Sequence, residues 1–211
     1  MTGTGVLAQF GVLLLVAVVW AAVFMNPIIL FSGHPIGQSL AVFLLFQSVL
    51  FLQPTHTADQ KRVGQRVHAS LNLAAFLSLV AGVAIVEYNK GLSRKAHFHS
   101  VHAYLGTVAV ALLVVQYLVG FTMWATPGLW GGEDKAKKLW RLHRIFAYAI
   151  VLPLLLLTVL FSTRTDYVAH VLNIPWWSLL VASVLIVAGV YPRLQLYKIL
   201  AGPRHVVSPA A

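Results

Sequence analysis

Six long apolar stretches constrain what this chain can fold into more than any other feature. The first runs from Leu7 to Leu30 without a charged residue, and a helix of that length spans the roughly 30 Å hydrocarbon core of a bilayer. The other five cover residues 34–52, 67–87, 101–124, 139–162 and 174–197. Hydrophobic residues make up 59% of the 211 residues and charged residues only 9%, whereas soluble domains have about a quarter of their residues charged. The sequence therefore predicts an all-α polytopic membrane protein with six transmembrane helices.

Short connections join these stretches, and no linker divides the chain. His34-Pro35 opens the second helix, where a first-turn proline is tolerated. Residues 54–66 are expected to form a polar loop, and Pro153 is expected to kink the fifth helix. A cleaved signal peptide is disfavoured for the first stretch because no basic residue precedes Leu7. We predict one domain over residues 1–211, with a functional core at about 31–162.

The distribution of basic residues predicts the orientation in the membrane. The net charge of +10 comes from Lys and Arg scattered over short connections, which favours a membrane-surface role over nucleic-acid binding. Alternate connections place eleven of them on one side: Lys61, Arg62, Arg66, Lys135, Lys137, Lys138, Arg141, Arg144, Arg193, Lys198 and Arg204. The other four, Lys90, Arg94, Lys95 and Arg164, fall on the opposite side. The positive-inside rule then puts both termini in the cytoplasm.

Four histidines lie near the starts of four successive helices. His34 and His102 begin helices that enter from the non-cytoplasmic face, whereas His68 and His143 begin helices that enter from the cytoplasmic face. One histidine near a helix end is usually a plain polar residue, but ionisable residues in membrane segments are rare, and these four are matched in depth. Because the chain has no cysteine, any metal chemistry must depend on histidine. Facing imidazoles in a helical bundle can ligate a cofactor, and two on one iron give a six-coordinate haem suited to electron transfer.

Short motifs surround these histidines: His34-Pro35, the segment around His68, the run HFHSVHAYLG that contains His102, and LHRIFAY with His143. Over about residues 31–161 they resemble the cytochrome b561 family. The resemblance implies a central four-helix bundle that holds two non-covalent haem b groups, one held by His34 and His102 and one by His68 and His143. It also implies transmembrane electron transfer from cytosolic ascorbate to monodehydroascorbate or a ferric chelate opposite, and hence an oxidoreductase.

Charged residues near each histidine pair are candidates for contacting these small-molecule partners. On the cytoplasmic side we expect this role for Lys61, Arg62, Arg66, Lys138, Arg141 and Arg144. On the other side the candidates are Lys90, Lys95, His97 and His99. Glu87 is expected to pair with Lys90 or Lys95. Gln38 and Asn72, each four residues after a histidine, are expected to hydrogen-bond inside the bundle.

Two other classes of function remain open from the sequence. The same histidines would serve a quinone-linked haem subunit of a membrane redox complex, or the proton relay of a transporter without haem. The sequence also leaves open a homodimer, the physiological donor and acceptor, and the particular membrane.

Overall fold

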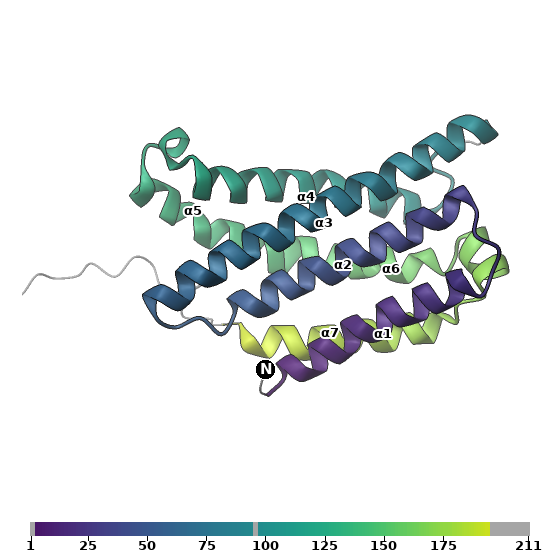
Figure 1. Cartoon of the computed structure of the whole chain (residues 1–211), viewed down its shortest axis with the longest axis horizontal. Helices are drawn as coiled ribbons and strands as arrows, with labels where there is room; N and C mark the ends of the chain where they lie inside the picture. Colours follow the sequence, from purple (N-terminus) through teal and green to yellow (C-terminus); the bar gives the residue numbers. More distant parts are fainter. Residues whose placement is uncertain (1–2, 95–96, 195–211) are drawn as a thin grey trace, which may run out of the picture.

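The computed structural model describes residues 3–94 and 97–194, and it consists of long helices lying side by side (Figure 1). The α-helices are α1 (Gly5–Phe24), α2 (Gly33–Leu52), α3 (Ala58–Ser93), α4 (Val101–Ala125), α5 (Glu133–Phe146), α6 (Leu152–Ser162) and α7 (Trp176–Val190). Shorter helical segments are η1 (Leu30–Ser32), η2 (Pro127–Trp130), η3 (Ala147–Val151), η4 (Tyr167–Leu172) and η5 (Tyr191–Arg193). Because η3 joins α5 to α6 in one span, the described residues contain 6 spans long and apolar enough to cross a membrane. The predicted fold class is confirmed.

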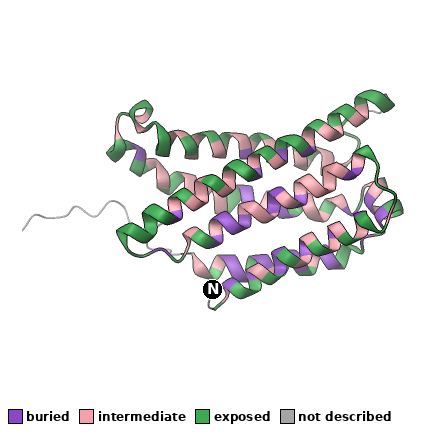
Figure 2. Cartoon of the chain, in the orientation of Figure 1, coloured by how far each residue is buried: buried purple, intermediate pink, exposed green. Residues whose placement is uncertain are grey.

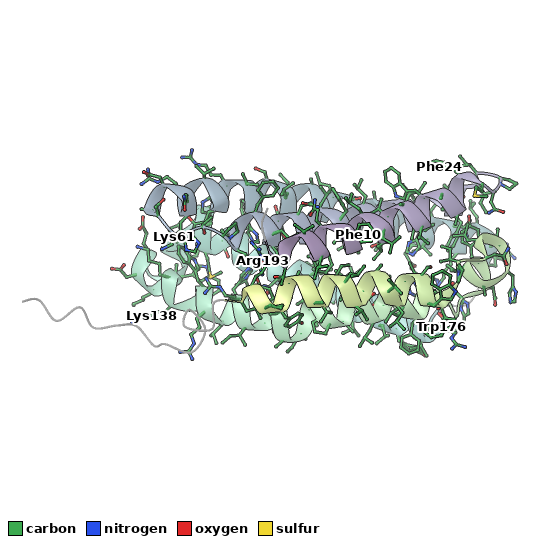
Figure 3. All side chains as sticks on the ribbon, turned by 90° about the horizontal axis from the view of Figure 1, so that it is seen from below. Phe10, Phe24, Lys61, Lys138, Trp176 and Arg193 are labelled. Carbon is green, nitrogen blue, oxygen red and sulfur yellow. The ribbon has the colours of Figure 1, made fainter. Side chains whose placement is uncertain are left out.

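The helices pack as three antiparallel pairs. α2 packs along α3, α1 along α7, and α4 along α5 and α6, while α1 also contacts α2 (Figure 1). Lys61 and Lys138 lie at one end of the bundle, and Phe24 and Trp176 lie at the other (Figure 3). We call these the basic end and the opposite end. Exposed residues run along the whole length of the outer helices (Figure 2), and many of them are large and apolar, as expected of surface that faces lipid.

Small residues let α1 and α7 approach closely. A Cβ atom added at Gly189 would lie 2.2 Å from the backbone nitrogen of Ala8, so only glycine fits there. Close contact through small residues is a common way for helices to associate in lipid. Gln9 and Gln47 add a reciprocal pair of side-chain hydrogen bonds of 3.0 and 3.2 Å between α1 and α2. These contacts attach α1 and α7 to one side of α2. The helices α3, α4 and α5 lie on the other side of α2.

Four predicted helix boundaries were wrong. α3 ends at Ser93 rather than at 87. α3 begins at Ala58 rather than at 67, because Thr57 and Gln60 form a capping box in which each side chain accepts the other's backbone N–H. α5 begins at Glu133 rather than at 139, with acidic residues in its first turn, where the helix dipole favours them. α1 ends at Phe24 rather than Leu30, since the residue before Pro27 is disfavoured in a helix. The predicted end of the last helix at 197 lies outside the described residues.

The helix in which a kink was expected at Pro153 is irregular just before that proline. Residues Ala147–Val151, which directly precede α6, form the π-helical segment η3, and Pro153 then lies in the first turn of α6. A π-helical segment inside an α-helix is uncommon and is often found at functional sites. It begins four residues after His143 along the same span.

Candidate functional site

His34 and His102 face each other near the opposite end of the bundle. His34 lies in the first turn of α2 and His102 in the first turn of α4. Their ring centroids are 6.3 Å apart, and the ring planes are inclined by 84°. The predicted pairing of these two residues therefore appears as a direct juxtaposition of two partly buried imidazoles.

Backbone carbonyls on neighbouring helices fix the orientation of both rings. His34 Nδ1 lies 2.9 Å from the carbonyl oxygen of Gly82 on α3, and His102 Nδ1 lies 2.9 Å from that of Thr158 on α6. A carbonyl only accepts hydrogen bonds, so each Nδ1 carries the proton and each Nε2 keeps a free lone pair. Histidines that bind metals almost always donate their other ring N–H in this way.

The spacing of this pair fits a shared metal. Imidazole nitrogens bind metal ions at about 2 Å, so two rings on opposite sides of one metal have centroids about 6 Å apart. The observed 6.3 Å between His34 and His102 agrees with that value. Phe31 stacks on His34 with a centroid distance of 5.6 Å, and Tyr167 meets Phe31 edge to face. The two aromatic rings thus cover one side of the His34 ring.

His68 and His143 form a second arrangement toward the basic end. They lie near enough to act on each other electrostatically. His68 Nδ1 is 3.3 Å from the carbonyl oxygen of Ser48, and Asn72 donates to the backbone oxygen of His68 at 2.6 Å. Gln38, the counterpart of Asn72, donates to the carbonyl of Leu79, so both expected hydrogen bonds inside the bundle are confirmed.

His143 is held differently from the other three histidines. Its Nδ1 atom is buried and has no hydrogen-bond partner among the residues that the structure describes. Gln116 on α4 donates to its backbone oxygen at 2.8 Å. A Cβ atom added at Gly120 would lie 2.8 Å from its Cε1 atom, so the absence of a side chain at Gly120 makes room for the ring. The position of the His143 ring is thus set by packing and by its backbone rather than by a hydrogen bond to Nδ1.

The two pairs lie at different depths in the bundle. His34 begins α2, and Ser48, which contacts His68, follows it on the same helix fourteen residues later. At 1.5 Å per residue the two levels are about 21 Å apart. The arrangement therefore provides two separate sites, one toward each end.

The basic candidates near His68 and His143 occupy the first turns of α3 and the length of α5. Lys61, Arg62, Arg66, Lys138 and Arg141 are exposed, and Arg144 is half-buried. Arg62 lies 3.9 Å from Asp59. Residues two apart on a helix point away from each other, so the closeness of Arg66 to His68 in sequence does not by itself bring their side chains together.

At the opposite end the structure places Lys90 close enough to His34 and His102 for its charge to act on both rings. Glu87 pairs with His97 at 3.3 Å, so the expected pairing with Lys90 was wrong. His99 is exposed. Lys95 lies outside the described residues.

Sequence reasoning missed several residues that shape the site. Gly120 was one glycine among many in apolar segments, and nothing in the sequence placed it against His143. The carbonyls of Gly82, Ser48 and Thr158 carry no sequence signal, because every residue has a carbonyl. Phe31 was detectable, since it lies three residues before His34 and thus on the same side of a helical turn.

The fold is that of a polytopic membrane protein in which histidines from different helices come together at two levels. A family model described as "Eukaryotic cytochrome b561" matches residues 33–169. The chain belongs to the cytochrome b561 family. It is an integral membrane protein, and membership of this family implies haem b as its cofactor.

Several curated proteins are similar to this chain. It is 28% identical over 126 residues to a lysosomal membrane ascorbate-dependent ferrireductase of Mus musculus, covering 59% of this chain and 51% of that protein. It is 28% identical over 109 residues to a plasma membrane ascorbate-dependent reductase of Mus musculus, covering 49% and 35%. A transmembrane ascorbate-dependent reductase of Mus musculus is 30% identical over 99 residues, covering 46% and 39%. The matches thus span about half the length of these relatives or less.

Proposed function

We propose that this chain is a transmembrane oxidoreductase that passes electrons across the membrane through two non-covalent haem b groups. His34 and His102 would hold one haem, and His68 and His143 the other. A haem held by two imidazoles is six-coordinate and supplies one-electron transfer, without an open position for O2 or substrate. The reductant proposed is cytosolic ascorbate or a similar small donor, and the acceptor is monodehydroascorbate or a ferric chelate.

The observation that carries this proposal is the geometry of His34 and His102. Two imidazoles from different helices face each other at 6.3 Å, and both Nδ1 atoms lie on carbonyls. A transporter that uses histidine for proton relay would need rings free to exchange protons with water or a neighbour. Rings oriented by carbonyls on Nδ1, each with Nε2 left unprotonated, suit an axial ligand pair better.

The proposed orientation places the basic end and both termini in the cytoplasm, following the positive-inside rule. Lys61, Arg62, Arg66, Arg141 and Arg144 would attract an anionic donor to the His68–His143 site. Lys90, Lys95 and His99 would receive an anionic acceptor beside the His34–His102 site. The names of the relatives support this assignment, because they describe ascorbate-dependent reductases and a ferrireductase.

A spectroscopic experiment tests the proposal. Full-length protein purified in detergent should show reduced-minus-oxidised bands of haem b, with reduction by ascorbate. Absence of haem bands would contradict the proposal and favour the transporter. Haem bands that respond to a quinol but not to ascorbate would instead favour a quinone-linked subunit.

A further inference from the structure

The π-helical segment between His143 and α6 leaves one backbone carbonyl without a helical partner. In an α-helix the carbonyl of Tyr148 would accept from the N–H of Leu152, but that N–H bonds to Ala147. In a π-helix its donor would be residue 153. Residue 153 is proline and has no N–H. Neither pattern therefore gives the Tyr148 carbonyl a backbone donor.

Tyr191 supplies the missing donor from another helix. Its hydroxyl donates to the carbonyl oxygen of Tyr148 at 2.7 Å. This hydroxyl belongs to η5, which directly follows α7, and the two tyrosine rings meet at a centroid distance of 6.4 Å. An unsatisfied carbonyl inside a membrane is costly. The Tyr191 hydroxyl thus compensates for what Pro153 removes.

Gln53 at the end of α2 ties the same three segments together. Its amide nitrogen lies 3.2 Å from both the Tyr148 hydroxyl and the carbonyl oxygen of Val190. Arg193 donates to its amide oxygen at 3.2 Å. Tyr148 consequently anchors the π-helical segment twice. Its carbonyl accepts from Tyr191, just after α7, and its hydroxyl accepts from Gln53, at the end of α2.

The π-helical segment determines how the two halves of its span face α4. Before it, the backbone and ring of His143 meet Gln116 and Gly120 of α4. After it, the carbonyl of Thr158 accepts from His102, also on α4. One extra residue in a helical turn rotates all that follows by about 100°. Replacing η3 with a regular α-helix would change the direction of Thr158 relative to His143 by about that angle.

We propose that Tyr191 is a positioning residue for both histidine pairs. By donating to the carbonyl that Pro153 leaves without a donor, it holds the π-helical segment and so sets the relative directions of His143 and Thr158. The positioning role rests on the proposed function, because it concerns residues that would hold haem. The hydrogen bond from Tyr191 to Tyr148 does not depend on the proposed function. The hydrogen bond and the positioning role are therefore tested separately.

The hydrogen bond is tested by a double-mutant cycle on full-length protein in detergent. Tyr191→Phe should lower the midpoint of thermal unfolding, followed by circular dichroism, by about 2–5 °C. Pro153→Ala restores an N–H to the segment, so Tyr191→Phe should have a much smaller effect in that background. Tyr167→Phe is the matched control, because its hydroxyl bonds to Ser32 at 3.0 Å and it lies in η4, beyond the end of α6 and fourteen residues after Pro153. Its effect should be the same in both backgrounds, since distant sites are additive.

The positioning role is tested by electron paramagnetic resonance of the oxidised protein. The low-spin ferric signal of the haem at His68 and His143 is the one that His68→Ala abolishes. Tyr191→Phe should shift that signal, and the shift should be smaller when Pro153→Ala is also present. An equal loss of stability from Tyr191→Phe in the wild-type and Pro153→Ala backgrounds would overturn the hydrogen-bond argument. A loss of stability with unchanged ferric signals would overturn the positioning role. Wild-type protein without any haem signal would contradict the proposed function, and the thermal cycle would still decide the hydrogen bond.

Discussion

The two histidine pairs differ in what holds their rings. At the opposite end, His34 and His102 each lie 2.9 Å from a carbonyl of a neighbouring helix. At the basic end, His68 has a longer contact of 3.3 Å, and His143 has no partner for Nδ1 among the described residues. Both rings of the first pair are therefore oriented by hydrogen bonds, whereas in the second pair the ring of His143 depends on packing.

This difference predicts which substitutions will displace the histidine rings of each pair. Carbonyl contacts come from the backbone and tolerate side-chain changes nearby, because they persist as long as the helices keep their places. The ring of His143 depends instead on the space left by Gly120 and on the π-helical segment that follows it. A hydrogen bond to Nδ1 also makes an imidazole a stronger electron donor to a metal. We expect the haem at His34 and His102 to have the lower reduction potential of the two.

The largest effect is expected from adding one methyl group beside His143. Gly120→Ala would place a Cβ atom 2.8 Å from His143 Cε1, so the ring must move. We expect roughly half or more of the haem at His68 and His143 to be lost, with the other haem retained, because a displaced ring cannot keep its place as a ligand. Haem content and redox titration of the purified variant measure both.

The matched control is the same substitution about four turns away on α4. A Cβ atom at Gly106 would meet only Thr158 Cγ2, at an ordinary 3.6 Å. Gly106→Ala should keep the haem content of the wild type. Equal losses in Gly120→Ala and Gly106→Ala would mean that the two sites do not differ in the way proposed.

A smaller effect is expected from the cations at the basic end. Arg66→Ala or Arg141→Ala should slow reduction by ascorbate a few-fold at low salt, because a lost cation weakens the encounter with an anion. Haem content should stay normal. Stopped-flow reduction at several ionic strengths measures the rates, and added salt should reduce the difference. Lys137→Ala is the control, since Lys137 is already paired with Glu133 and Asp134. Rates that neither substitution nor salt alters would leave the basic donor site without support.

The smallest effect is expected at the opposite end. Lys90→Ala should lower the rate at which ascorbate-loaded vesicles reduce an external ferric chelate by about twofold, because the half-buried Lys90 attracts an anion over only about 8 Å at physiological salt. The spectra of both haems should remain normal. A neutral acceptor should be reduced at the same rate by both proteins. If wild-type vesicles reduce monodehydroascorbate but never the ferric chelate, the proposal that a ferric chelate is an acceptor is wrong. Transmembrane electron transfer would still be supported.

Much of the fold could be predicted because lipid imposes strong rules on sequence. Long apolar stretches indicated the six spans, and helix parity alone indicated that His34 and His68 lie at different depths. Boundaries failed where polar residues form helix ends outside the apolar core. Thr57 and Gln60 extend α3 by nine residues beyond the predicted start at 67, and a hydropathy argument cannot detect that cap.

The details of the site were less predictable, for physical reasons. The hydrogen bond from His102 to a carbonyl of α6 depends on how two helices are rotated, and that rotation follows from the π-helical segment. Pro153 was visible in the sequence, but Tyr191, which donates to the Tyr148 carbonyl, lies 38 residues after Pro153 and in another helix. Only the three-dimensional arrangement connects such residues.

The central claim is that the bundle holds two haems in separate histidine pairs, and haem stoichiometry tests it most directly. Wild-type protein should contain two haems per chain. The double variant His68→Ala/His143→Ala should retain one, and so should His34→Ala/His102→Ala, whereas His34→Ala/His68→Ala should retain none. One haem in the wild type, or equal haem content in the within-pair and cross-pair double variants, would contradict the account.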